Sequence, residues 1–120
     1  MATFRKFEDI LAWQKARKVT RSVYRLTTEG SFSKDFELRS QIRRASVSIM
    51  ANIAEGFGRR SDKEFANFTN IAHGSATETQ SHLYVALDLG YLSQDDFNLL
   101  YELLAEICRM LYALGVKLRT

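Results

Sequence analysis

The sequence predicts an all-α protein, folded as a single antiparallel up-down four-helix bundle that occupies residues 1–120. Three observations predict this fold. Apolar residues recur at every third or fourth position through four successive segments, which is the period of a helix. No segment shows the sustained alternation of apolar and polar residues that is typical of a half-buried strand. The chain also contains no proline, the residue that most often interrupts a helix.

The first two helices are predicted over about residues 7–27 and 33–57, each with an apolar row along one face. The rows are formed by Ile10, Trp13, Ala16, Val19, Val23 and Leu26, and by Leu38, Ile42, Ala45, Ile49 and Ile53. A polar, glycine-containing joint separates the two segments. Gly56 and Gly58 are expected to end the second helix, because glycine readily takes the left-handed conformation at a helix C-terminus.

The last two helices are each predicted to begin at a serine cap. Ser61 and Glu64 have the spacing of a capping box, and Gly90 closes that segment. Ser93 is followed by acidic residues in the first turn of the fourth helix. This helix carries an apolar seam spaced alternately by three and four positions, namely Phe97, Leu100, Leu104, Ile107, Leu111, Leu114 and Leu118. Helices of this length, joined by short connections, must pack antiparallel.

The fourth segment carries more apolar surface than a bundle helix needs. Leu99, Leu103 and Met110 lie on one flank of its seam, and Tyr101 and Tyr112 lie on the other. The apolar arc therefore covers roughly 200°, against the roughly 100° that is usual for a bundle helix. Deeper burial within one chain would explain the surplus, but we favour contact with another subunit, because large exposed apolar patches usually mark interfaces.

Basic residues are concentrated in the first half of the chain. Residues 1–63 contain 14 Lys and Arg against 7 Asp and Glu, whereas residues 64–120 contain 3 against 7, so that net charges of +7 and −4 make up the total of +3. The candidates for binding a polyanion are Lys18, Arg21 and Arg25 on the first helix, Arg39, Arg43 and Arg44 on the second, and Arg59, Arg60 and Lys63 at the next joint.

This charge pattern has two interpretations. The basic face binds a nucleic-acid backbone or an acidic protein, or it is a solvated face whose charges pair with the acidic half of the same chain. Base stacking is not expected, because most of the aromatic residues lie on the apolar rows.

The sequence contains no recognisable catalytic or metal-binding constellation. His73 and His82 are nine positions apart, which places them on opposite faces of one helix. Glu78 shares a face with His82, and this pair predicts a hydrogen bond rather than a metal site. Cys108 lies in an apolar stretch and is expected to act as an inert packing residue. We therefore expect a protein that is not an enzyme and that uses no metal or cofactor.

The same features predict a cytoplasmic location. A single cysteine cannot form an internal disulfide, which is typical of proteins in a reducing compartment. The N-terminus lacks the apolar stretch of a signal peptide, and no apolar run approaches the roughly 18 residues of a membrane span. We expect no contact with a membrane.

Motifs distributed over nearly the whole chain match one known family. They read FEDILAWQKA at residues 7–16, SQIRRA at 40–45, NIAEG at 52–56 and LDLGYL at 87–92. The chain resembles the four-helix bundle protein family that includes the 23S ribosomal RNA intervening-sequence proteins, also called S23 ribosomal proteins. This resemblance implies an antiparallel bundle that assembles into an oligomeric ring, a homopentamer, and has no enzymatic activity.

The resemblance also implies partners. The family is distantly similar to the accessory variability protein of diversity-generating retroelements, a basic pentamer that binds nucleic acid and a reverse transcriptase. The expected partners are therefore other copies of the chain, RNA or DNA, and a reverse transcriptase or another protein. The alternative is a protein-interaction scaffold that binds no nucleic acid.

Asn52, Glu55 and Gly56 form the most specific part of the family signature. We favour a structural role for them, as part of a polar network that fixes how helices or subunits meet, because buried polar groups must be paired. Family members often carry proline in the first joint and before this signature, whereas this chain has no proline at residues 32–33 or 50–51. The missing prolines predict a second helix that runs without interruption.

Overall fold

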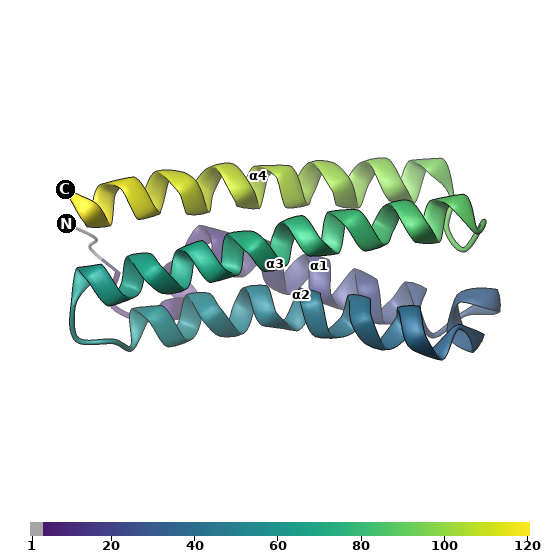
Figure 1. Cartoon of the computed structure of the whole chain (residues 1–120), viewed down its shortest axis with the longest axis horizontal. Coiled ribbons are helices and arrows are strands. Elements are labelled where there is room, and N and C mark those ends of the chain that lie inside the picture. The colour runs from purple at the N-terminus through teal and green to yellow at the C-terminus, as the bar shows by residue number, and fades with distance from the viewer. Residues whose placement is uncertain (1–3) are drawn as a thin grey trace.

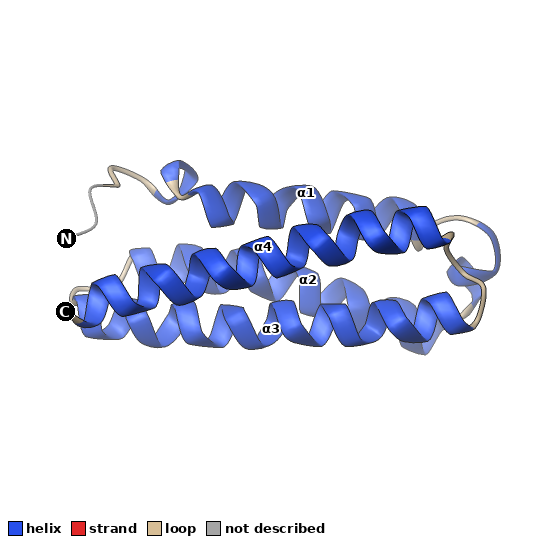
Figure 2. Ribbon diagram, turned by 90° about the horizontal axis from the view of Figure 1, so that it is seen from above, coloured by secondary structure: helices blue, strands red, loops and turns tan. Residues whose placement is uncertain are grey.

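Four antiparallel helices run up and down along one axis in the computed structural model, which describes residues 4–120 (Figure 1). They are α1 (Leu11–Leu26), α2 (Phe36–Phe57), α3 (Asp62–Asp88) and α4 (Gln94–Arg119), with short 3-10 helices η1 (Phe7–Asp9) and η2 (Gly30–Lys34) before α1 and α2. The joints lie at the two ends of a bundle measuring 45 × 21 × 19 Å (Figure 2). The predicted all-α, up-down four-helix fold is confirmed.

The first two α-helices begin later than the sequence predicted. Ile10 has an extended backbone conformation, with φ of −76° and ψ of 116°, so that η1 and α1 are separate elements. Residues 30–34 form η2, so residues 33 and 34, which were predicted to begin the second helix, lie outside α2. Asp35 then caps α2, because its side chain accepts a hydrogen bond from the Leu38 backbone N–H at 3.1 Å. Apolar spacing alone does not separate a 3-10 turn from the helix that follows it.

The serine caps of α3 and α4 are confirmed. The hydroxyl oxygens of Ser61 and Ser93 each accept a hydrogen bond at 3.1 Å, from the backbone N–H groups of Glu64 and Asp96 respectively. The Ser61 hydroxyl also donates to the Glu64 carboxylate at 3.2 Å. Gly90 follows α3 with a φ of 74°, a conformation that L-residues rarely adopt. α2, in turn, runs without interruption, as the missing prolines predict.

α2 ends at Phe57 with Gly58 as its C-cap, as predicted, but the left-handed conformation expected of the glycines at this end is wrong. Gly58 has a φ of −75°, and in residues 4–120 only Gly30 and Gly90 have positive φ values. Gly56 is buried inside the last turn of α2, where an added Cβ would lie 2.6 Å from the Cβ of Phe68. This glycine lets α2 and α3 approach more closely than any side chain would permit.

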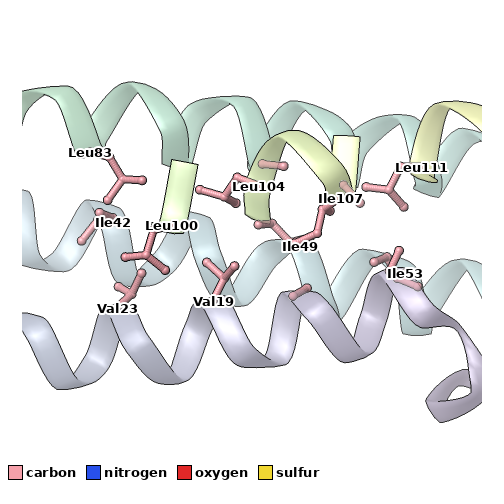
Figure 3. Packing of buried hydrophobic residues seen from close by; sticks show 14 of the residues in the cluster. Val19, Val23, Ile42, Ile49, Ile53, Leu83, Leu100, Leu104, Ile107 and Leu111 are labelled. Carbon is pink, nitrogen blue, oxygen red and sulfur yellow. The ribbon is translucent and has the colours of Figure 1, made fainter. Parts of the chain in front are cut away.

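Aliphatic side chains from all four helices fill the interior (Figure 3). The predicted apolar rows face this core, with Trp13, Leu26 and Leu114 half-buried at its margin. Each fully buried aliphatic side chain stabilises the fold by roughly 1.5–3 kcal/mol relative to exposure. The largest of them in the centre of the bundle include Val19, Val23, Ile42, Ile49, Ile53, Leu83, Leu104, Ile107 and Leu111.

We predict that Gly56→Ala lowers the free energy of unfolding by about 1–3 kcal/mol, because the new methyl group forces α2 and α3 apart. Gly74→Ala is the matched control, since a Cβ at this position of α3 meets nothing within 4 Å. It should raise the free energy of unfolding by up to about 1 kcal/mol, through better helix propensity. Urea denaturation followed by circular dichroism measures both changes. Equal stability of the Gly56→Ala variant and the wild type would contradict the close helix approach.

Candidate nucleic-acid interface

The basic stripe of α1 lies on its solvent side. Lys18, Arg21 and Arg25 are all exposed, and they lie opposite the buried row of Ala16, Val19 and Val23. Lys18 and Arg21 also line a shallow groove on the surface of α1. The stripe therefore presents its charges to solvent along the outer face of the bundle.

The three candidate arginines of α2 lie at the end of the bundle that holds the joint between α1 and α2. They line a groove of about 330 Å³, which we call the joint groove. Its six residues are Tyr24, Phe36, Arg39, Ser40, Arg43 and Arg44. The groove thus combines residues from α1 and α2.

Arg43 is fixed by contacts with the end of α1. Its Nε donates a hydrogen bond to the Thr27 hydroxyl at 2.8 Å, and one Nη donates to the Thr28 hydroxyl at 3.3 Å. The guanidinium carbon lies 4.5 Å from the centroid of the Tyr24 ring, which is a cation–π contact. Arg43 therefore joins the two helices while keeping its charge at the surface.

Arg39 has a similar arrangement one turn earlier in α2. Its guanidinium donates to the backbone carbonyl of Ser33 at 2.7 Å and lies 4.8 Å from the centroid of the Phe36 ring. Arg44 is exposed and donates to the Ser40 hydroxyl at 3.4 Å. In the part of the chain that the structure describes, no carboxylate lies within 4.0 Å of these three guanidinium groups.

The start of α2 is held by Asp35, which links both joints at this end of the bundle. One carboxylate oxygen accepts from the Leu38 N–H, and the other accepts from the Tyr91 hydroxyl at 2.9 Å. The Tyr91 ring stacks on the buried Phe32 ring, with 5.0 Å between the centroids. The hydrogen bond to Asp35 raises the pKa of Tyr91. These contacts position the first turn of α2, which carries Phe36 and Arg39.

Arg59, Arg60 and Lys63 lie at the opposite end of the bundle, at the joint between α2 and α3. The 20 positions between Arg39 and Arg59 correspond to roughly 30 Å along a helix. Arg59 is paired with Glu55 at 2.7 Å, and its guanidinium lies 4.7 Å from the Phe68 ring centroid. The structure therefore divides the candidates into a larger group on α1 and α2 and a smaller group at the far end.

Ion pairs do not neutralise the basic half of the chain. Across residues 4–120, the only ion pair between the basic half and the acidic half joins Lys15 of α1 to Glu106 of α4, at 3.4 Å. Of the nine candidate cations, Arg59 alone has a carboxylate within 4.0 Å in these residues. The pairing with the acidic half that the solvated-face interpretation invoked is therefore limited to Lys15 and Glu106 in the described residues.

The signature residues make contacts within the chain. The side-chain amide of Asn52 donates to the carbonyl and the hydroxyl of Ser48, at 2.8 and 2.9 Å. The Ser48 hydroxyl lies 2.8 Å from the hydroxyl of Ser75, so this chain of hydrogen bonds connects α2 to α3. Glu55 is exposed and makes only the ion pair with Arg59 among the contacts of the described residues.

The flanks of α4 are partly covered by the chain itself. Tyr101, Leu103 and Met110 are half-buried and pack against the core. Leu99 and Tyr112 are 71% and 70% exposed, but their spacing of 13 positions places them about 140° apart around the helix. The five candidates therefore do not form one continuous patch. Leu99 and Tyr112 are available for contact on two different sides of α4.

The remaining polar candidates form no larger cluster. His82 and Glu78 lie 3.2 Å apart within α3, as predicted for a hydrogen-bonded pair. Burial raises the pKa of the Cys108 thiol. Within residues 4–120, no three His, Cys, Asp or Glu side chains lie close enough together to hold a metal ion. No helix over the same residues combines the length and the apolar character needed to cross a bilayer.

Comparison with known proteins identifies the family. The family model of the 23S rRNA-intervening sequence proteins matches residues 8–113. The chain belongs to this family. A crystal structure of a protein of unknown function from the S23 ribosomal protein family of Bacteroides thetaiotaomicron VPI-5482 is also similar, with a TM-score of 0.78 and 26% sequence identity. The match covers 86% of this chain and 96% of that chain, whereas no curated protein matches.

Two residues that line the joint groove, Tyr24 and Phe36, were not among the candidates that the sequence predicted. Both are exposed, although aromatic residues were expected on the apolar rows. The spacing could have indicated that these rings lie beside the basic residues, because residues three positions apart are neighbours on a helix surface. Tyr24 follows Arg21 by three positions, and Phe36 precedes Arg39 by three. The contact between Tyr24 and Arg43 has no such signal, since it depends on how α1 and α2 meet.

We predict that Tyr91→Phe lowers the thermal midpoint at pH 7, because Asp35 loses a hydrogen bond. Because the pKa of Tyr91 is raised in the folded protein, the neutral Tyr91 hydroxyl contributes fully to stability below the unfolded pKa of about 10. This contribution to stability is lost as the pH rises through the folded pKa. The difference in midpoint between the variant and the wild type should therefore narrow above about pH 10. Circular dichroism melting curves test this, with Tyr112→Phe as the control. If the difference in thermal midpoint between wild type and Tyr91→Phe widens at high pH, the stabilising hydrogen bond from Tyr91 to Asp35 is contradicted.

Proposed function

We propose that this family member is a non-enzymatic, oligomeric helical-bundle protein that binds nucleic acid, RNA in the first place, through the basic surfaces of α1 and α2. The observation that carries this proposal is the exposed stripe of Lys18, Arg21 and Arg25, for which residues 4–120 supply no pairing carboxylate. Exposed, unpaired cations on one face attract a phosphate backbone and release its counterions on binding.

The arginines of the joint groove extend this basic surface from α1 onto α2. Arg43 contacts the end of α1 directly, so the two groups of cations belong to adjoining parts of one surface. The name of the family refers to an intervening sequence of 23S rRNA, which favours RNA as the first nucleic acid to test. Arg59, Arg60 and Lys63 are too distant to contribute to the same short segment, and they are expected to contribute only when a longer strand is bound.

We predict that Lys18→Glu combined with Arg21→Glu weakens RNA binding by about tenfold or more, because two phosphate contacts are lost. The slope of log affinity against log salt should fall by about 1.4–2. Arg109→Glu combined with Lys117→Glu is the matched control, since it makes the same change in net charge at exposed positions of α4. Arg39 and Arg43 are unsuitable for this test, because both donate hydrogen bonds that hold the α1–α2 joint.

Fluorescence anisotropy with a labelled RNA, over a range of salt concentrations, measures both quantities. Equal losses in the two double variants would indicate a general effect of net charge and would contradict a site on α1. If the wild type binds no RNA or DNA even at low salt, nucleic-acid binding is wrong. That outcome would favour the alternative of a scaffold for a reverse transcriptase or another protein.

We also propose that the chain assembles into a ring, a homopentamer. The support is the exposure of Leu99 and Tyr112 on α4 and the resemblance of the chain to ring-forming relatives.

We predict that light scattering gives a mass of roughly five times 13.8 kDa. Leu99→Glu and Tyr112→Glu, tested separately, should reveal which side of α4 meets a neighbour by lowering that mass. A wild type that runs as a monomer at all concentrations would contradict the ring.

A further inference from the structure

The joint groove differs from the rest of the basic surface in carrying two exposed aromatic rings. Phe36 is 67% exposed and Tyr24 is 42% exposed, although both lie in a bundle with a well-filled aliphatic core. Leaving a phenyl ring in water is unfavourable by the same hydrophobic effect that buries Phe32 a few residues away. The two rings are therefore available for contact with a ligand that has an apolar, planar surface.

Each ring has an arginine over one face. The guanidinium carbons of Arg43 and Arg39 lie 4.5 and 4.8 Å from the ring centroids of Tyr24 and Phe36. Two flat rings, each in contact with a flat cation, therefore lie at one groove. Nucleic-acid bases stack on aromatic rings and on guanidinium planes, and the phosphates that flank those bases require positive charge nearby.

We propose that the joint groove binds an unpaired nucleotide segment, whose bases stack on Tyr24, Phe36 and the guanidinium planes of Arg39 and Arg43. This inference rests on the proposed function and specifies its ligand as single-stranded nucleic acid. Arg44, which also lines the groove, and Arg21, one turn before Tyr24 on α1, supply the positive charge for the flanking phosphates.

The shape of the groove favours a single strand over a duplex. In a duplex the base faces are covered by neighbouring bases, so that only phosphates and groove edges can be contacted. A concave volume of about 330 Å³ accommodates individual bases but not a double helix. A flat stripe of cations would bind both forms through their phosphates, whereas exposed rings add affinity only for unpaired bases.

The groove is also pre-organised. Thr27 and Thr28 hold the Arg43 guanidinium, and the Ser33 carbonyl holds that of Arg39. Asp35 fixes the first turn of α2 through its hydrogen bonds to Leu38 and Tyr91. Because these side chains are already ordered, binding loses little additional conformational entropy.

The test is a double variant, Tyr24→Leu with Phe36→Leu, in the full-length protein. Leucine keeps an apolar side chain at both positions but removes the flat ring, and the arginines remain. Tyr84→Leu is the matched control, because Tyr84 is a comparably exposed aromatic residue on α3, on the acidic half of the chain. Thermal unfolding establishes that the variants are folded before binding is measured.

The probes are a fluorescein-labelled RNA strand of about 12 nucleotides, the same strand annealed to its complement, and the DNA strand of the same sequence. We expect the wild type to bind the single strands more tightly than the duplex. The double variant should lose about tenfold in affinity for a single strand, little for the duplex, and nothing in its salt slope. Tyr84→Leu should bind like the wild type. The affinities for the RNA strand and for the DNA strand establish which of the two the protein prefers.

A photochemical measurement does not depend on the variants. Single-stranded RNA carrying 5-iodouridine cross-links to aromatic side chains stacked on the modified base, and we expect the cross-linked peptides to contain Tyr24 or Phe36. Cross-links confined to α3 and α4 would overturn the inference.

The outcomes separate this inference from the proposed function. Equal affinity for single strand and duplex, unchanged in the double variant, would overturn stacking in the groove. If binding still weakens in Lys18→Glu with Arg21→Glu, phosphate binding by α1 stands. An absence of binding to every probe at low salt would overturn both.

Discussion

The packing of α2 against α3 is the constraint on which the remaining structure depends. At Gly56 the two helices are so close that an added methyl group would lie 2.6 Å from the Cβ of Phe68. The hydrogen bonds of Asn52, Ser48 and Ser75 continue the same contact toward the middle of the bundle. Since α2 contributes to the core, to the joint with α1 and to the basic surface, its fixed position determines where the arginines project. The signature residues Asn52 and Gly56 thus help to fix the helix that carries Arg39, Arg43 and Arg44.

The arginines of the joint groove have both a structural and a surface role. Their hydrogen-bond partners are hydroxyl and carbonyl oxygens rather than carboxylates, so the contacts position the guanidinium groups without neutralising their charge. A carboxylate partner would have stabilised the joint and removed the attraction for a polyanion. The carboxylate of Asp35 lies at the same joint but is occupied by the Leu38 N–H and the Tyr91 hydroxyl. Charge is thereby retained on the surface of a well-ordered joint.

Local sequence patterns predicted the helices well where a single residue or a regular period decides the structure. Ser61, Ser93 and Gly90 mark helix ends through their own chemistry, and the heptad spacing of α4 places its seam in the core. Prediction failed at Ile10, at η2 and at Gly56. The first two depend on short 3-10 turns that share the apolar period of a helix, and the third depends on a neighbouring helix that is distant in sequence.

The sequence by itself determined the all-α class, the four segments, the family and the unequal charge of the two halves, because these follow from composition, periodicity and local motifs. Only the tertiary structure decided which cations share a surface. The predicted length of the second helix already separates Arg59, Arg60 and Lys63 from the others, whereas the tertiary structure brings Arg39, Arg43 and Arg44 together with Tyr24 in one groove. It also placed the Tyr24 ring beneath Arg43, a contact between residues 19 positions apart that exists only because α1 and α2 pack antiparallel. Contacts between helices depend on how their faces meet, and no periodicity within one helix specifies that arrangement.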